Sequence, residues 1–196
     1  MIPRNRRVLL IVLVVMLVTL TGCAIAYRRG GLPEEETWPP SRTGDFKSIN
    51  LQIDEKWEVE GEGLPTVLSS HTRRLFEDSG LFWDIVEGPS SPASDRQVRV
   101  RTRCAYSSPW YVTPVHILSG WIIPMSRERW TVDIELEVRD QGGEFLGVVA
   151  ISETETTMVS ILFLPIGPFI SGGSIIVLYS DAVRAAISEA NAQGLF

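Results

Sequence analysis

The chain has 196 residues, with eighteen Lys and Arg against twenty-four Asp and Glu, and a formal net charge of −6. Three of the basic residues, Arg4, Arg6 and Arg7, precede an uncharged apolar stretch, so the remainder of the chain carries a net charge of −9. An acidic balance of this size argues against a nucleic-acid partner. The roughly 174 residues that follow the apolar stretch are enough for one domain with its own hydrophobic core.

The first predicted element runs from Met1 to Cys23. A basic head is followed by apolar residues from Val8 to Leu20, and then by Leu20-Thr21-Gly22-Cys23. A basic head, an apolar middle and small residues before a cut are the parts of a secretory signal peptide. The last four residues resemble the lipobox of bacterial lipoproteins. In that family the Cys sulfur receives a diacylglycerol, the peptide is cut before the Cys, and the new amine is usually acylated.

This resemblance implies a signal peptide of residues 1–22 and a mature protein held on a membrane by lipid on Cys23. The alternative is an uncleaved anchor, because the uncharged run from Val8 to Tyr27 is long enough to cross a bilayer. Both interpretations place the rest of the chain outside the cytoplasm. In enteric lipoproteins an Asp after the lipidated Cys retains the protein in the inner membrane. Ala24 therefore implies the outer membrane, facing the periplasm, with the periplasmic side of the inner membrane as the alternative.

A flexible tether is predicted after the membrane-proximal segment. Residues 28–45 contain three Pro, three Gly and a run of Glu, which is typical of a flexible coil. The expected organisation is thus a lipidated Cys and tether over residues 23–45, followed by a single α+β domain over residues 46–196.

The domain is predicted to begin with a strand, a helix and a second strand. Residues 46–53 alternate between apolar and polar side chains, as in a half-buried strand, and an acidic loop follows to Gly63. Pro65 can open a helix that ends at Gly80, and residues 81–86 form a short strand. His71 lies on or beside the apolar side of the helix. We expect it to be a packed, hydrogen-bonded core residue and not a ligand, since no metal-binding spacing surrounds it.

Two charged strands carry the clearest pairing signal. The strand over residues 97–106 has Arg99, Arg101 and Arg103 on one face. The strand over residues 128–140 has Asp133, Glu135 and Glu137 on one face. We expect the two strands to be antiparallel neighbours with these charges facing each other. The arrangement could instead be a basic stripe for lipid phosphate, but a charge ladder on a solvent-exposed face is favoured. Cys104 falls on the apolar side and is expected to be a buried, unreactive thiol without a disulfide partner.

A hairpin and a last helix complete the predicted domain. Residues 140–143 form a turn, and residues 144–157 return as a strand whose two faces are both apolar, so it is central in the sheet or covered on both sides. The last helix begins at Ser174 and ends at Gly194. The order of elements predicts an α+β two-layer sandwich, with a mostly antiparallel sheet of about five strands and two helices on one face. In element order and size it resembles small α+β envelope lipoproteins, such as auxiliary lipoproteins of lipid transport or outer-membrane assembly.

No chemical motif accompanies this fold. The sequence contains no G-x-S-x-G elbow, no phosphate-cradling Gly-rich loop and no H-E-x-x-H, and its two His are far apart. We therefore expect a protein that is not an enzyme, with no metal and no cofactor.

Two segments do not fit a soluble domain. Residues 108–125 and 158–170 are apolar, aromatic and broken by Pro, and the hairpin between them brings both to the same end of the sheet. One interpretation is a docking patch for a membrane or an apolar partner, which predicts a binding or adaptor lipoprotein that contacts lipid or a membrane protein. The other is that the segments fill the core of a purely structural lipoprotein without a ligand. The predicted contact residues are Trp110, Tyr111, Trp121, Phe163, Leu164 and Phe169.

Overall fold

The computed structural model describes residues 24–30, 38–41, 44–58, 67–88, 94–108, 114–115, 118, 125–159 and 175–196. The chain divides into two compact units. Unit 1 comprises Met1–Arg28, Ser107–Arg129 and Glu155–Gly173, and unit 2 comprises Arg29–Tyr106, Trp130–Thr154 and Ser174–Phe196. Cys23 and the six predicted contact residues, Trp110, Tyr111, Trp121, Phe163, Leu164 and Phe169, lie outside the described residues.

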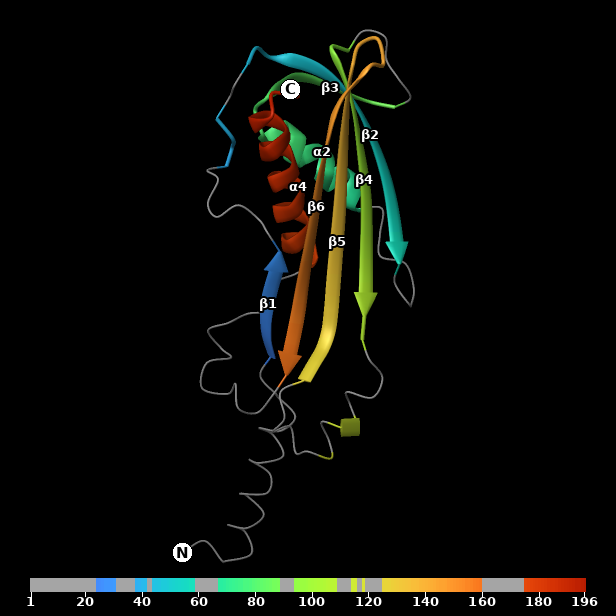
Figure 1. Ribbon diagram of the computed structural model, residues 1–196, viewed down its shortest axis with the longest axis vertical. Helices are drawn as coiled ribbons and strands as arrows, with labels where there is room; N and C mark the ends of the chain where they lie inside the picture. The colour runs from blue at the N-terminus through green and yellow to red at the C-terminus, as the bar shows by residue number, and fades with distance from the viewer. Residues whose placement is uncertain are drawn as a thin grey trace, which may run out of the picture. The chain divides into compact units, whose positions relative to one another are not determined.

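From residue 46 onward the secondary structure follows the predicted order of strand, helix, strand, three-strand meander and helix, and one further strand precedes it. The elements are β1 (Ala24–Gly30), β2 (Lys47–Glu58), α2 (Val67–Asp78), β3 (Phe82–Glu87), β4 (Arg96–Ser107), β5 (Met125–Asp140), β6 (Phe145–Val159) and α4 (Ile175–Ala192) (Figure 1). Within the described ranges, neither helix combines the length and the apolar character needed to cross a membrane.

The α+β prediction is confirmed, and the sheet is mixed. Its strand order is β1-β6-β5-β4-β2-β3. Strand β2 is parallel to both β3 and β4, whereas β4 and β6 run opposite to β5 (Figure 1). The parallel pair β2–β3 follows from the helix between them, because parallel neighbours need a crossover connection. Strand β6 lies between β1 and β5, so the prediction of a central strand is correct. Its Leu146 and Val148 are 40% and 46% exposed, so it is not covered on both sides.

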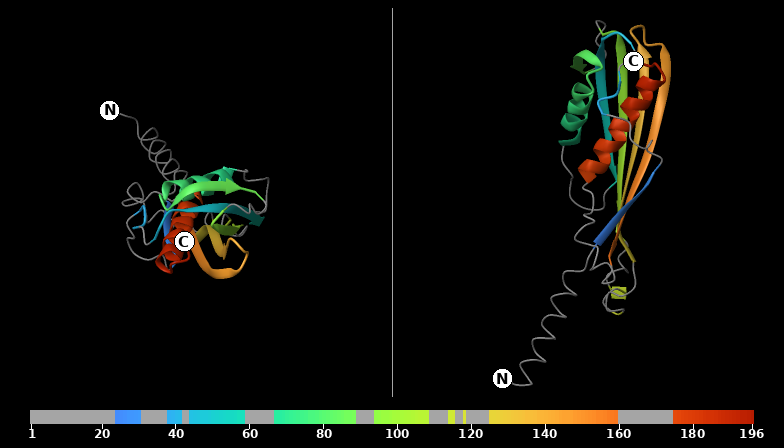
Figure 2. Two further views of the ribbon diagram at one scale, coloured as in Figure 1. Left: turned by 90° about the horizontal axis from the view of Figure 1, so that it is seen from above. Right: turned by 90° about the vertical axis from the view of Figure 1, so that its left-hand side faces the viewer.

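One face of the sheet carries the hydrophobic core of unit 2. The alternating apolar residues of β4 and β5 are buried on this face, where α2 and α4 both pack (Figure 2). Gly80 and Gly194 end the two helices as predicted, each with a positive φ, of 64° and 71°, that suits glycine. The main buried side chains of the core are Ile49, Leu51, Phe76, Val98, Val100, Val132, Ile134, Leu136, Leu178, Tyr179 and Ile187.

Strand β2 is longer than predicted. It continues to Glu58, through residues that the sequence analysis placed in an acidic loop. Asp54 and Lys56 keep the alternation on the open face, but Glu55 occupies a core-facing position where the pattern calls for an apolar residue. Because Glu55 interrupts the apolar alternation, the sequence pattern did not predict the second half of the strand.

Two described ranges fall within the segment predicted as lipidated Cys and tether. Ala24–Gly30 forms β1, and residues 38–41 pack along α4. The guanidinium carbon of Arg184 lies 5.5 Å from the centre of the Trp38 ring, and the Asn191 side-chain amide donates to the Ser41 carbonyl at 2.9 Å. The Pro and Gly content of the segment predicted flexibility, but the Trp38 side chain is partly buried against the hydrophobic core.

The β5–β6 hairpin closes at the predicted turn, between Asp140 and Phe145. The Asp140 N–H donates to the Glu144 carbonyl at 2.9 Å, the Gly143 N–H donates to the Asp140 carbonyl at 3.1 Å, and Gly143 has a φ of 84°. On the returning strand Val149 is buried and Ile151 packs against the core.

Candidate functional site

The open face of the sheet in unit 2 carries a ladder of charged side chains. Arg101 on β4 forms ion pairs with two carboxylates of the neighbouring strand β5, those of Glu135 and Glu137, the latter at 3.3 Å. Glu137 also accepts from Arg139 at 2.6 Å, and its side chain is only 10% exposed. The predicted adjacency of these two strands, with their charges on a common face, is therefore confirmed.

Two of the six charged residues bond to residues outside this pair of strands. Arg99 bonds to Asp54 on β2 at 2.6 Å, and Asp133 accepts a hydrogen bond from Ser152 on β6 at 2.6 Å. Because β4 has a strand on each side, its long arginine side chains can reach either neighbour. The prediction considered only the β5 acids as partners, because the sequence does not show that β2 also lies next to β4.

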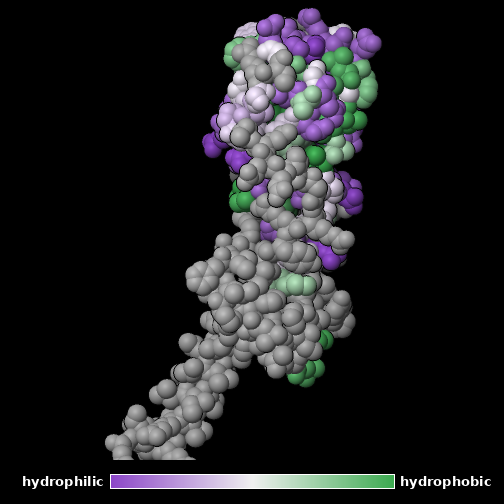
Figure 3. Space-filling view, turned by 60° about the vertical axis from the view of Figure 1, so that its left-hand side comes forward, coloured by the Kyte–Doolittle hydropathy of each residue, from purple (hydrophilic) through white to green (hydrophobic). Residues whose placement is uncertain are grey.

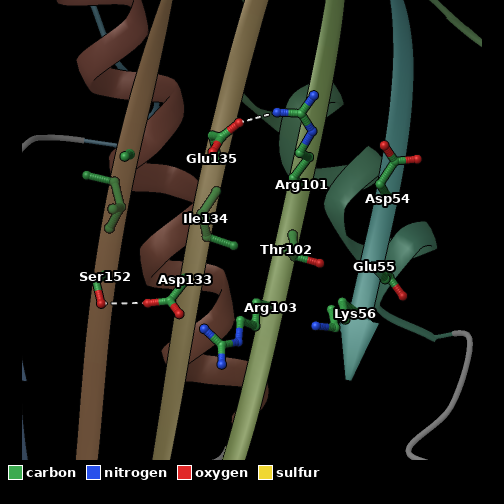
Figure 4. A pocket seen from close by; sticks show the side chains of 12 residues that line it. Asp54, Glu55, Lys56, Arg101, Thr102, Arg103, Asp133, Ile134, Glu135 and Ser152 are labelled. Atoms are coloured by element: carbon green, nitrogen blue, oxygen red, sulfur yellow. Dashed lines mark hydrogen bonds and ion pairs between the residues drawn. The ribbon is translucent and has the colours of Figure 1, made fainter. Parts of the chain in front are cut away.

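A groove of about 520 Å³ follows this ladder across β2, β4, β5 and β6 (Figure 4). A smaller hollow of about 150 Å³ continues on the same face beside Asn50 and Gln97. The charged residues and hydroxyl residues that line the larger groove with side chains on the open face are Asp54, Lys56, Arg101, Arg103, Asp133, Glu135 and Ser152. Glu55 and Thr102 also border the groove, although their side chains belong to the other face.

A buried polar cluster lies on the other face, between the helices and the sheet. The Thr72 hydroxyl donates to the Leu68 carbonyl at 2.8 Å, so the Tyr179 hydroxyl, 2.6 Å away, donates to Thr72. Tyr179 also shares a hydrogen bond with Thr102. Burial raises the pKa of the Tyr179 phenol well above its ordinary value, and the Thr72 hydrogen bond offsets this only in part. The cluster thus joins α2, α4 and β4 through neutral hydroxyls.

We expect Tyr179→Phe to lower the free energy of unfolding by about 1–3 kcal/mol, because it removes the hydroxyl that bonds two buried threonines. Tyr179 and Thr72 are fully buried and Thr102 is 4% exposed, so water cannot replace the lost bonds. Urea unfolding followed by circular dichroism measures the difference. A Tyr106→Phe variant, at a less buried position, controls for the loss of a phenol, and equal stability of the Tyr179 variant and the wild type would contradict the expectation.

His71 joins the two helices and does not form a catalytic pair. Its Nε2 lies 2.7 Å from the Ser180 hydroxyl, which itself donates to the Ile176 carbonyl. The imidazole is therefore the donor to Ser180 and cannot act as the base that activates it. Burial, followed by the charges of Arg184 and Arg74, lowers the pKa of His71. The prediction of a hydrogen-bonded His is confirmed, but His71 is half-buried beside the core and not a core residue.

Cys104 is 1% exposed, as predicted for the apolar side of β4. Burial, with contributions from Glu55 and Asp133, raises the pKa of its thiol to about 12. The group is therefore protonated at neutral pH, and its low reactivity stays a prediction. Over the part of the chain that the structure describes, no three side chains of the His, Cys, Asp and Glu types gather to hold a metal ion.

Unit 2 also has exposed hydrophobic residues. On the face shown in Figure 3, hydrophilic residues cover most of the described surface, and hydrophobic residues form smaller patches between them. Trp83 on the edge strand β3 is 65% exposed, and Phe145 at the hairpin is 54% exposed. The sequence analysis did not single out Trp83, because one aromatic residue in a short strand gives no signal of its exposure.

Comparison with known proteins gives limited similarity. No protein-family model matches the chain, and no curated protein matches it. Among solved structures it is similar to a PelC dodecamer variant from Paraburkholderia phytofirmans, with a TM-score of 0.39, 10% identity, and coverage of 84% of this chain and 95% of that one. For a second PelC dodecamer from the same organism, the TM-score is 0.36 and the identity is 11%, with coverage of 84% of this chain and 96% of that one. For a DUF4136 family protein from Bacteroides thetaiotaomicron, the TM-score is 0.23 and the identity is 14%, with coverage of 88% of this chain and 97% of that one.

Proposed function

We propose that the chain is a lipid-anchored, non-catalytic binding or adaptor module of the bacterial envelope that docks on a membrane through unit 1. The observation that carries the proposal is the content of unit 1. Its three ranges include Cys23 and the whole of the two Pro-rich apolar segments, residues 108–125 and 158–170. The lipid attachment site and the aromatic segments, distant in the sequence, thus belong to one unit.

The distribution of charge between the units supports the same proposal. Unit 2 contains twelve Lys and Arg against twenty-two Asp and Glu, a net charge of −10. After cleavage at Cys23, unit 1 contains Arg28, Arg127 and Arg129 against Glu128 and Glu155, a net charge of +1. An anionic lipid surface repels a strongly acidic unit and accepts a nearly neutral one.

The side chains that unit 1 offers suit the boundary between lipid and water. Trp110, Tyr111 and Trp121 combine an apolar ring with a polar group, the combination enriched where membrane proteins meet the headgroups. Ala24 after the lipidated Cys assigns the anchor to the outer membrane in this proposal, with the inner membrane as the alternative. The absence of catalysis is part of the proposal, and the donor role of His71 toward Ser180 is consistent with it.

The test compares two tryptophan substitutions in a non-lipidated chain of residues 23–196 that carries Cys23→Ser. Trp121→Glu alters unit 1, and Trp83→Glu alters a 65% exposed position of unit 2. We expect Trp121→Glu to weaken binding to vesicles of phosphatidylcholine and phosphatidylglycerol at least tenfold, because a carboxylate does not enter the headgroup region at low cost. Trp83→Glu should leave binding unchanged, and sedimentation of the vesicles measures both.

The melting temperature distinguishes docking from packing. The proposal requires Trp121→Glu to reduce vesicle binding without lowering the melting temperature. If the substitution unfolds the protein, the two segments are core, and the chain is better described as a structural envelope lipoprotein without a ligand.

A further inference from the structure

The sheet of unit 2 ends at β3, and this edge strand is open to solvent. In the strand order β1-β6-β5-β4-β2-β3, β3 has β2 on one side and is the last strand on the other. Every second residue of an edge strand turns its N–H and C=O groups away from the sheet, where another extended chain can pair with them. Asp84 and Glu87 are exposed and Val86 is 36% exposed, so the outer side of β3 is accessible.

A β-bulge places an aromatic ring on this edge. In the register with β2, Phe82 and Asp84 face consecutive residues of that strand, so Trp83 between them is an extra residue. A bulge bends its strand locally and re-aims a side chain. The Trp83 side chain is 65% exposed, whereas Phe82 is partly buried against the core. Trp is among the residues that most often anchor a bound protein, and the core does not use this one.

The charge of the edge is negative. The charged residues of β3 are Asp84 and Glu87, and both are acidic. Over the described residues the Asp84 carboxylate is in no ion pair, and the Glu87 carboxylate lies 3.6 Å from a guanidinium nitrogen of Arg73. Lys47, the cation of β2 in this register, lies opposite Phe82 and not opposite either acid. Unit 2 as a whole has a net charge of −10. A basic strand therefore suits this edge, and a second copy of the same acidic strand does not.

We propose that β3 binds an extended, basic segment of a protein partner, which adds to the sheet as a further strand. Main-chain hydrogen bonds hold the segment, and side chains of the edge select it. A Lys or Arg beside Asp84 forms an ion pair, and one over the Trp83 ring is attracted to its π face. Asp84 and Val86 lie on one face and Ile85, partly buried against the core, lies on the other, so the segment alternates basic and apolar residues. The site lies in unit 2 and does not depend on the membrane docking proposed for unit 1.

The experiment titrates a fluorescent peptide of alternating Lys and Val into the full chain held in phosphatidylcholine nanodiscs, with fluorescence anisotropy as the readout. Phosphatidylcholine has no net charge, so the nanodisc does not attract the peptide by itself. We expect saturable binding that falls at least tenfold in Trp83→Ala and severalfold in Asp84→Asn. The matched controls are Phe145→Ala and Glu144→Gln, which alter an exposed aromatic residue and an exposed acid at the β5–β6 hairpin. A peptide with Glu in place of Lys should not bind.

N-methylation of the peptide distinguishes strand addition from attraction between charges alone. Methyl groups on every second backbone nitrogen remove donors without changing the charge. An added strand turns alternate N–H groups toward β3, so methylation in one phase should abolish binding and methylation in the other should preserve it.

Three results would overturn the proposal. The first is the absence of saturable binding, or binding that survives methylation in both phases. The second is equal binding by the wild type, Trp83→Ala and Asp84→Asn. The third is pairing of nanodiscs that each hold one chain, lost in Trp83→Ala, because a second copy then occupies the edge. Equal melting temperatures of the variants and the wild type show that a loss of binding is not a loss of fold.

Discussion

Cys23→Ser is expected to abolish incorporation of labelled fatty acid and to leave the precursor uncleaved. The proposed lipidation at Leu20-Thr21-Gly22-Cys23 requires a thiol at the last position, because lipoproteins with this type of sequence carry the diacylglycerol on the Cys sulfur. A serine hydroxyl does not replace it. The loss of label is expected to be complete, because a variant without the acceptor thiol has no atom to which the lipid is attached. It also loses the membrane attachment that an acyl chain provides, about 0.8 kcal/mol per buried methylene.

Metabolic labelling with palmitate and the mobility of the protein on a denaturing gel measure the two parts of this expectation. Cys104→Ser is the control, because that thiol is buried in the core of unit 2 and is not part of the lipobox-like sequence. It should be labelled and cleaved as the wild type is. Processing of Cys23→Ser to the same size as the wild type would contradict the lipoprotein interpretation and leave the uncleaved anchor as the alternative.

The fold was predictable where one face of an element is uniformly apolar. The alternation in β4 and β5 predicted both strands, their common polar face and the buried position of Cys104, and the structure has all three. The direction of β2 was not predictable in this way, because a period of two is the same in parallel and antiparallel strands. The helix between β2 and β3 was the signal that could have indicated a parallel pair.

The candidate site was less accessible to sequence analysis than the fold. Lys56 was assigned to a loop, because Glu55 interrupts the apolar side of the strand just before it. Lys56 lies opposite Arg103 only because β2 and β4 are neighbours in the sheet. In the sequence the two strands are separated by α2, β3 and their connections. A site formed by two strands that are distant in the sequence leaves no motif, so only the sheet order shows it.

The C-terminal residues close the core of unit 2, and their contacts lead to the second large prediction. Phe196 is 8% exposed and packs edge to face on Phe82, with ring centres 5.0 Å apart. Phe82 in turn lies 5.9 Å from Phe76, which is fully buried. Beside it, Leu195 packs over Gly147 on β6, where a Cβ would come within 2.7 Å of a Leu195 methyl group. The chain end thus contacts β3 and β6 on the same apolar face.

Phe196→Ala is therefore expected to lower the free energy of unfolding by about 3 kcal/mol, near the lower end of the range for a buried Phe, because its ring keeps a small exposed area. Urea unfolding of the non-lipidated chain measures it. Phe145→Ala removes the same ring from a position that is 54% exposed, and it should change stability by no more than about 0.5 kcal/mol. Equal effects of the two substitutions would show that the aromatic contacts of Phe196 do not stabilise the fold. A large effect confined to Phe196 would show that any tag added to this end must leave its ring in place against Phe82.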